Sequence, residues 1–185
     1  MRLDKLTKDQ VEKLYRERMQ EDFPPNELDP LEVITEAAEQ GNYECFGLMD
    51  GEEIAGYAFL LKHGEDYLID YLGICPEWRK HGLWGEMLDM VWEYLKNAKS
   101  ILGEVEDPDF AENAADKEIR TERLEFYLGR GFRDTGVKVT YFGAAFMVIE
   151  AEQTPVHTPE EIRTLYAMHY KAFLPEGSFE ENVIL

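Results

Sequence analysis

Residues 67–88 of this 185-residue chain combine side chains and spacing that suit an anion site. An apolar segment, YLIDYLGI, is followed by Arg79-Lys80-His81-Gly82 and then by the apolar pattern of a helix. The first turn of a helix has unpaired N–H groups at the positive end of the helix dipole, so it can bind a phosphate or carboxylate. The alternative is an ordinary helix start with a glycine near its N-cap, and both interpretations stay open on this stretch alone.

Two familiar phosphate motifs are excluded by the same spacing. No Gly-Lys-Ser/Thr follows, as a P-loop requires, and the three-glycine dinucleotide fingerprint is missing. The histidines are scattered without ligand spacing, so no metal site is predicted: His63, His81, His157 and His169. Cys45 and Cys75 also lack paired spacing, which favours a reducing, cytoplasmic setting.

The composition restricts the class of protein. There are 39 Asp and Glu against 19 Lys and Arg, a formal net charge of −20, and 44% of residues are hydrophobic. The apolar content is too high for a disordered acidic chain, and the charge disfavours nucleic acid and anionic membranes as partners. No apolar run approaches the ~20 residues of a membrane span. We therefore expect one globular domain over residues 1–185.

Capping patterns, apolar periodicity and turn residues predict the elements. Helices are expected from Thr7 to the Phe23-Pro24 stop, from Asp29 to Gly41, and over 82–97, 117–129 and 158–173. Strands are expected over 43–49, 54–62, 67–74, 100–105 and, as a pair, within 132–150. Asp29, Pro30 and Glu32 fit the N-cap, first and third positions of the second helix. This order predicts an α/β (α+β) fold, a mixed sheet with helices on its faces.

Two motifs in this order resemble those of the GNAT acyltransferase superfamily. Its pyrophosphate loop reads Q/R-x-x-G-x-G/A after the fourth strand, and the chain offers Arg79-Lys80-His81-Gly82-Leu83-Trp84, with Trp84 where a small residue is usual. Residues 126–132, FYLGRGF, resemble the family's F-Y-x-x-x-G-F signature, and 22–30, DFPPNELDP, resemble a helix-to-loop segment of a bacterial subgroup. The resemblance covers residues 1–150 as a core, with 151–185 as a C-terminal extension carrying the last helix.

The resemblance implies a mostly antiparallel central sheet that splays between its fourth and fifth strands, with helices on both faces. Acyl-CoA binds at that splay. The residues expected to hold it, through the strand backbone, the loop amides and one guanidinium, are Leu72, Gly73, Ile74, Arg79, His81, Gly82, Leu83, Trp84 and Gly85.

Tyr127 matches the tyrosine that protonates the departing CoA thiolate in many members of the family. The alternative is a core aromatic beside Phe126 and Phe132. An amine acceptor must also lose a proton, and Glu104 and Asp70 are the expected bases, ahead of Glu106. For each of these acids, an exposed carboxylate at a strand end is the other interpretation.

Two further features stay open. Arg120 stands where the family often has a CoA-binding asparagine, so it either contacts a CoA phosphate or pairs with Asp116 one turn away. The acids Asp22, Glu27 and Asp29 either line a substrate entrance or cap and solubilise the first helices.

The predicted function is an acyl-CoA-dependent N-acetyltransferase that passes acetyl from acetyl-CoA directly to a primary amine within a ternary complex. The net charge favours a small cationic acceptor. No metal, nucleic acid or membrane is expected to take part, and the oligomeric state is open, a homodimer included. The alternative is a GNAT-like domain that binds a ligand or partner without transferring an acyl group.

Overall fold

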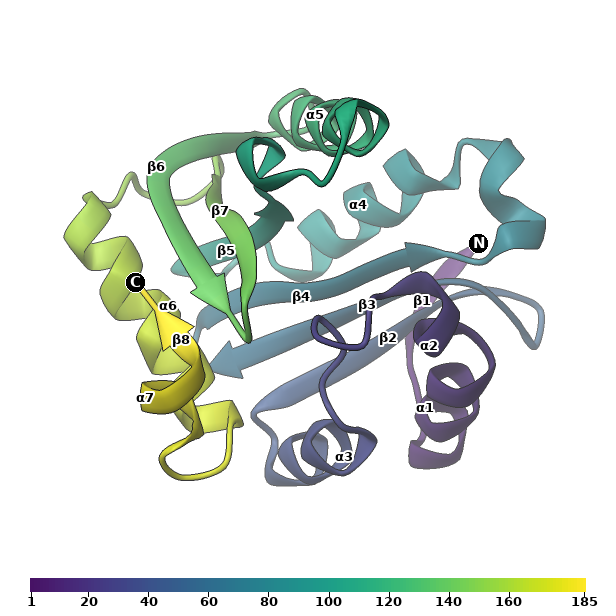
Figure 1. Ribbon diagram of the computed structural model, residues 1–185. Helices are drawn as coiled ribbons and strands as arrows, with labels where there is room; N and C mark the ends of the chain where they lie inside the picture. The colour runs from purple at the N-terminus through teal and green to yellow at the C-terminus, as the bar shows by residue number, and fades with distance from the viewer.

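A computed structural model describes the chain over residues 1–185, except for the side chains of Lys80 and His81. Along this described backbone the strands form one sheet in the order β1-β2-β3-β4-β5-β7-β6-β8 (Figure 1). The strands are β1 (Arg2–Lys5), β2 (Tyr43–Asp50), β3 (Glu53–His63), β4 (Asp66–Ile74), β5 (Ser100–Glu106), β6 (Phe132–Tyr141), β7 (Ala144–Ala151) and β8 (Val183–Ile184). Only β4 and β5 pair in parallel, and the remaining neighbours are antiparallel.

The helices cover both faces of this sheet. They are α1 (Lys8–Leu14), which continues through one π-helical turn into α2 (Gln20–Asp22), α3 (Leu31–Gln40), α4 (Leu83–Tyr94), α5 (Ala114–Leu128), α6 (Pro159–Phe173) and α7 (Ser178–Asn182). Capping boxes at Thr7 and Thr158 start α1 and α6, as their sequences predict. The predicted mixed α/β fold is confirmed.

The sequence-based prediction ends with the helix over 158–173 and does not include α7 and β8. Three further details of it are wrong. Strand β1 was not expected, because four residues reading RLDK show no alternation of apolar and polar side chains. Asp29 is not the N-cap of α3; Pro30 is, and the Asp29 side chain is buried against tyrosine hydroxyls. Helix α5 begins three residues earlier than predicted, because Asn113 accepts hydrogen bonds from the N–H groups of its first turn.

Each face of the sheet has its own apolar core. On one face α1, α3 and α6 bury Leu14, Ile34 and Ile162. On the other face α4 and α5 pack Leu88, Val91 and partly buried Leu124 against the sheet (Figure 1). Among the residues that the structure describes, no helix combines the length and apolar character needed to cross a bilayer.

The sheet opens between β4 and β5. Their parallel pairing runs from Asp66 opposite Ser100 to Ile69 opposite Gly103 and stops there, although both strands continue. Next to this point β3 pairs with β4 at Ile69 and then at Tyr71, so Asp70 is the extra residue of a β-bulge. The predicted splay between the fourth and fifth strands is confirmed. We call this opening the fork, and Asp70 and Glu104 are the first residues beyond its closed end.

Candidate active site

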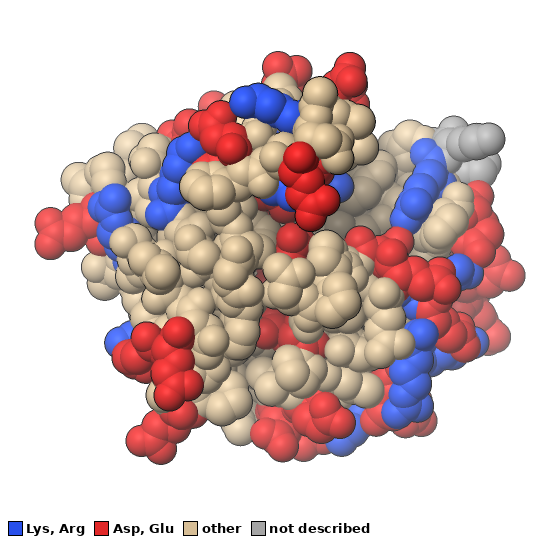
Figure 2. All heavy atoms as spheres, in the orientation of Figure 1, with Lys and Arg blue, Asp and Glu red and all other residues tan. Residues whose placement is uncertain are grey.

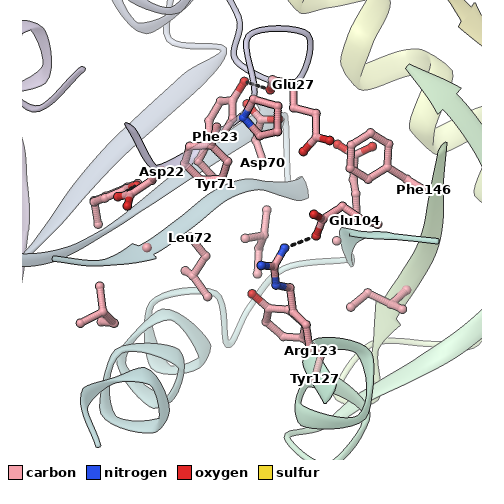
Figure 3. Close-up of a pocket in the computed structure, with 18 of the residues that line it drawn as sticks. Asp22, Phe23, Glu27, Asp70, Tyr71, Leu72, Glu104, Arg123, Tyr127 and Phe146 are labelled. Atoms are coloured by element: carbon pink, nitrogen blue, oxygen red, sulfur yellow. Dashed lines mark hydrogen bonds and ion pairs between the residues drawn. The ribbon is translucent and has the colours of Figure 1, made fainter. Parts of the chain in front are cut away.

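A cavity of about 510 Å³ occupies the fork. Its walls come from both faces of the sheet (Figure 3). Phe23, Tyr71 and Asp70 lie on the side of the N-terminal helices, whereas Arg123 and Tyr127 approach from α5. The fork therefore makes a passage that joins the two faces, with acids on one side and the Tyr127 phenol on the other.

Glu104 lies on the α6 face of β5, where two tyrosines of α6 contact its carboxylate. The Tyr166 hydroxyl donates to Oε2 at 2.6 Å, and the Tyr170 hydroxyl donates to Oε1. Burial raises the pKa of Glu104 to about 7, and the two tyrosine hydrogen bonds limit that rise by stabilising the anion. A carboxyl with this pKa can both accept and release a proton near neutral pH.

Asp70 faces the same side because the bulge turns it there. Tyr43 from β2 donates to its Oδ2, and Tyr170 lies 3.1 Å from its Oδ1. Burial, together with the charges of Asp29 and Glu104, raises the pKa of Asp70 well above its usual value. Asp70 and Glu104 are thus joined through one tyrosine of α6.

A third carboxyl, Asp29, lies near the other two without being part of the cavity wall. The Tyr141 hydroxyl donates to Asp29 Oδ1 at 2.5 Å, and the Tyr71 hydroxyl lies 2.9 Å from Oδ2. Burial raises the pKa of Asp29 to about 6, against the opposing effect of these hydrogen bonds. Glu27 lines the cavity nearby, and burial raises its pKa to about 7, with the charge of Glu106 adding to the rise.

An ion pair stands at the open end of the fork. Arg79 Nη2 lies 2.6 Å from Asp22 Oδ1, and Arg79 Nε donates to the Ile74 carbonyl at 3.0 Å. The Tyr57 hydroxyl donates to the other Asp22 oxygen at 2.8 Å. Arg79 therefore links the end of β4 to α2. The side chains of Arg79, Asp22 and Tyr57 all line the cavity.

Tyr127 stands on the opposite wall. It lies edge-on to the rings of Phe126 and Phe132, at centroid distances of 5.5 Å and 5.7 Å. Both interpretations of Tyr127 from the sequence therefore apply, since the ring packs in an aromatic cluster and also lines the cavity. Burial raises the pKa of Tyr127 to about 12, so the phenol keeps its proton at neutral pH. Beside it, Arg123 pairs with Glu106.

The start of α4 lies next to this wall. Gly82 adopts a left-handed conformation with φ +68, and none of the described side chains caps the helix. Trp84 lines the cavity and packs edge-on against Phe126 at 6.3 Å. The space above Gly85 is taken by the Arg130 guanidinium, 2.5 Å from where a Cβ would stand. Exposed backbone donors and a cation thus meet at this helix end.

The remaining residues expected to bind CoA are placed as follows. Leu72, Gly73 and Ile74 lie on the part of β4 that has no partner strand on the β5 side, and all three line the cavity. Leu83 is buried in the apolar cluster under α4. The side chain of His81 lies outside the described residues. Arg120 pairs with Asp116 at 3.1 Å and is not part of the cavity wall.

The sequence prediction missed the tyrosines that surround the acids. Tyr43, Tyr141, Tyr166 and Tyr170 come from β2, β6 and α6, which are far apart in the chain. The one local signal was on α6, where Tyr166 and Tyr170 are four residues apart on the helical face that packs on the sheet. Their partners follow only from the tertiary arrangement.

The cavity is lined by more acids than bases: Glu21, Asp22, Glu27, Asp70, Glu104 and Glu106 against Arg79 and Arg123. Both arginines are ion-paired with acids of the same wall. Figure 2 shows acidic side chains around and inside the hollow below α5. The structure thus joins a negative recess to a helix end that suits an anion. Among the described residues, no group of three potential metal ligands is found.

Comparisons with known proteins agree with the fold. A sequence model of the acetyltransferase (GNAT) family matches residues 8–115. Among solved structures, a GNAT-family acetyltransferase from Bacteroides thetaiotaomicron is 20% identical with a TM-score of 0.73, covering 94% of this chain and 98% of its own. A spermidine N-acetyltransferase variant from Vibrio cholerae is 11% identical with a TM-score of 0.63, covering 83% and 95%.

An acetyltransferase from Bacillus subtilis, solved in complex with CoA, is 18% identical with a TM-score of 0.53, covering 81% of this chain and 97% of its own. No curated protein sequence matches this chain at a significant level. At these identities the solved structures show a shared fold.

Proposed function

The chain belongs to the acetyltransferase (GNAT) family, whose model covers more than half of its residues, and we propose that it transfers acetyl from acetyl-CoA to a small cationic amine through the fork. One observation carries this proposal. A single cavity places an acid with a pKa near neutrality on one side of the sheet and a protonated phenol on the other. Amine acylation needs a base for the acceptor and a proton donor for the leaving group.

Glu104 is the proposed base. A primary amine is mainly protonated at neutral pH, so the acceptor must first give a proton to the enzyme. With a pKa of about 7, the Glu104 carboxylate can take that proton and later return it to solvent. The freed nitrogen lone pair then forms the new C–N bond as the C–S bond breaks, within a ternary complex. The nitrogen then releases its second proton, which balances the proton that the departing sulfur receives.

Tyr127 is the proposed proton donor to the departing sulfur. Its pKa of about 12 keeps the phenol protonated at neutral pH, and it lines the cavity on the α5 side. A thiolate that leaves toward this wall can receive the phenolic proton as the C–S bond breaks.

The acetyl donor fits the α4 side of the fork. When bound, acetyl-CoA supplies an activated thioester, a diphosphate and an adenosine phosphate. The unpaired edge of β4 at 72–74 can pair with the pantetheine amides, while the N–H groups that begin α4 can take the diphosphate. Arg130 adds positive charge there, and Arg79 and Arg120 are further candidates for phosphate contact.

The acceptor fits the acidic side. Six carboxyl side chains line the cavity, and both lining arginines are already paired, so a cationic amine is attracted and an anionic one is repelled.

Burial of Cys45 and Cys75 as free thiols agrees with a reducing cytoplasm.

An acetyl-CoA thiol-release assay against a panel of amines tests this function. We expect turnover with di- and polyamines, little with amino acids of net negative charge, and about a 10²-fold lower kcat in Tyr127→Phe with acetyl-CoA affinity kept. Tyr94→Phe is the matched control, because that hydroxyl donates to Glu44 at 2.8 Å outside the cavity. Absence of thiol release with every amine, or equal rates for Tyr127→Phe and wild type, contradicts the proposal.

A further inference from the structure

Two partly buried acids and three tyrosines form one continuous hydrogen-bonded network at the fork. Tyr43 contacts Asp70 Oδ2, Tyr170 contacts both Asp70 Oδ1 and Glu104 Oε1, and Tyr166 contacts Glu104 Oε2. No lysine or arginine pairs with either acid among the side chains that the structure describes. The oxygen–oxygen contacts among these five side chains therefore depend on the protons that the side chains themselves carry.

The number of protons can be counted. Three phenols bring three protons, but four oxygen–oxygen contacts each need one. Tyr170 has one proton and touches two carboxyl groups, so it donates to one and must accept from the other. The fourth contact is satisfied only when one of the two carboxyl groups is itself protonated.

The surroundings indicate which acid holds that proton. Glu104 receives two phenolic donors, one on each oxygen, which stabilises its anion. Asp70 receives one donor, Tyr43, which leaves its other oxygen facing the Tyr170 hydroxyl. Asp70 also lies close to the charges of Asp29 and Glu104, which disfavour its anion.

We propose that Tyr170 joins Asp70 and Glu104 into a unit whose two carboxyl groups share one proton at rest, with that proton on Asp70 and the negative charge on Glu104. Asp70 donates to the Tyr170 oxygen, and Tyr170 donates to Glu104. Glu104 is then the base that meets the acceptor, while Asp70, Tyr166 and Tyr170 are positioning residues that act through it. This inference rests on the proposed function for its catalytic meaning, although the proton count stands on the geometry.

The unit can also move its charge without net change. If Asp70 passes its proton to the Tyr170 oxygen while Tyr170 passes its own proton to Glu104, the negative charge moves from Glu104 to Asp70. Two O–H bonds break and two form, and no proton enters or leaves. The other ionisable groups facing the unit are Glu27 and Asp29 from the α2–α3 segment, Cys45 from β2, Tyr71 from β4 and Tyr141 from β6.

Helix α6 therefore takes part in the site. Both Tyr166 and Tyr170 come from this helix, which lies outside the residues that the family model matches. It packs on β3, β4 and β6, so its tyrosines reach β5 at the fork. The C-terminal extension thus supplies the groups that hold the base.

Two matched substitutions on α6 test the bridge. Tyr170→Phe removes the link between the acids, whereas Tyr166→Phe removes one donor to Glu104 and leaves the link intact. We expect Tyr170→Phe to lower kcat on the order of tenfold and to move the acidic limb of the pH–rate profile, with the KM for acetyl-CoA kept. Tyr166→Phe should lower kcat less and keep the shape of the profile. Equal profiles for the two variants would overturn the bridge.

A second pair of substitutions locates the proton without any assay of acyl transfer. Asn at position 70 reproduces protonated Asp, because its carbonyl accepts from Tyr43 and its NH₂ donates to Tyr170. Gln at position 104 accepts only one of two tyrosine donors. We expect Asp70→Asn to keep the wild-type denaturation midpoint at pH 7 and Glu104→Gln to lower it. The reverse order, or equal effects, would overturn the assignment.

The same pair gives a kinetic reading. Asp70→Asn should lower kcat/KM far less than Glu104→Gln, and equal losses would identify Asp70 as a base and overturn the inference. If wild type releases no thiol with any amine, the proposed acyl transfer fails. The denaturation midpoints still decide where the proton lies, so the two failures are distinguishable.

Discussion

The two sides of the fork solve different physical problems. On the α6 side, Asp29, Asp70 and Glu104 are each bound by tyrosine hydroxyls, so their positions are fixed before any ligand arrives. On the α4–α5 side, the helix start at Gly82 has no side-chain cap among the described residues, and the edge of β4 has no partner there. One side is preorganised by internal hydrogen bonds, and the other offers free backbone groups.

The two sides of the fork therefore have different tasks: one holds carboxyl groups, and the other binds the acetyl donor. Buried carboxyl groups are costly unless they are hydrogen-bonded, and the tyrosines meet that cost while keeping the pKa of Glu104 near 7. A ligand with many amides and phosphates, in contrast, needs unpaired donors that it can satisfy itself. Substitutions on the two sides should therefore affect different kinetic constants.

The largest expected effect is on the acidic side. Glu104→Gln removes the proposed base, and we expect kcat/KM at neutral pH to fall by about 10²–10⁴-fold while acetyl-CoA affinity stays the same. Glu106→Gln is the control, because that acid lies two residues further along β5 and is paired with Arg123. Steady-state kinetics and isothermal titration measure the two constants. A loss of acetyl-CoA affinity in Glu104→Gln would remove the distinction between the sides.

An intermediate effect is expected at the start of α4. Gly82→Ala introduces a Cβ at φ +68, which costs about 1–2 kcal/mol and displaces the amides that begin the helix. We expect acetyl-CoA to bind about tenfold more weakly, with the KM for the amine unchanged. Gly64→Ala is the matched control, since its φ is +64 in the turn between β3 and β4.

Both alanine variants should lose similar stability, because no atom that the structure describes lies within 4 Å of a Cβ added to either glycine. Their comparison separates the strain itself from its location. Equal acetyl-CoA affinity in the two variants would contradict a role for the α4 amides in binding.

The smallest effect concerns pH and stability. Burial raises the pKa of Glu27 from its ordinary value of 4.5 to about 7, so the folded protein binds an extra proton between these pH values. Folding stability from this group is present below pH 4.5 and is lost as pH rises through 7. Because Glu27 is partly exposed, solvent screening reduces this effect. We expect Glu27→Gln to raise the free energy of unfolding by about 1 kcal/mol at pH 8 and to leave it unchanged at pH 4.

Urea denaturation at both pH values measures this change, with the exposed Glu36→Gln on α3 as the control. A gain of the same size at pH 4 would show that the effect of Glu27→Gln is not electrostatic. Burial would then not explain a free-energy cost of ionising the acids on this side of the fork.

The two sides also differ in how well their sequences predicted them. The α4–α5 side is encoded locally, in 79–85 and 126–132, and the sequence placed Gly82, Trp84 and Tyr127 on elements that the structure brings to one cavity. The elements themselves were predictable because capping boxes and apolar periodicity are also local.

The acidic side is encoded over long distances. Glu104 and Tyr170 are 66 residues apart, and Asp29 and Tyr141 are 112 apart. Asp29 was assigned as a helix cap because its neighbours Pro30 and Glu32 fit that local pattern, whereas packing against the sheet buries it instead. No spacing in the sequence could pair these groups, since the pairing depends on the bulge at Asp70 and on how α6 docks.

A crystal structure of the protein with acetyl-CoA is the most direct test of acetyl transfer through the fork. We expect the diphosphate on the amides that begin α4, the pantetheine along 72–74, and the thioester in the fork. Its sulfur should lie within hydrogen-bond distance of the Tyr127 hydroxyl, with the carbonyl carbon open to Glu104. If the Trp84 indole fills the diphosphate position, or if the sulfur is turned away from Tyr127, acetyl transfer through the fork is contradicted.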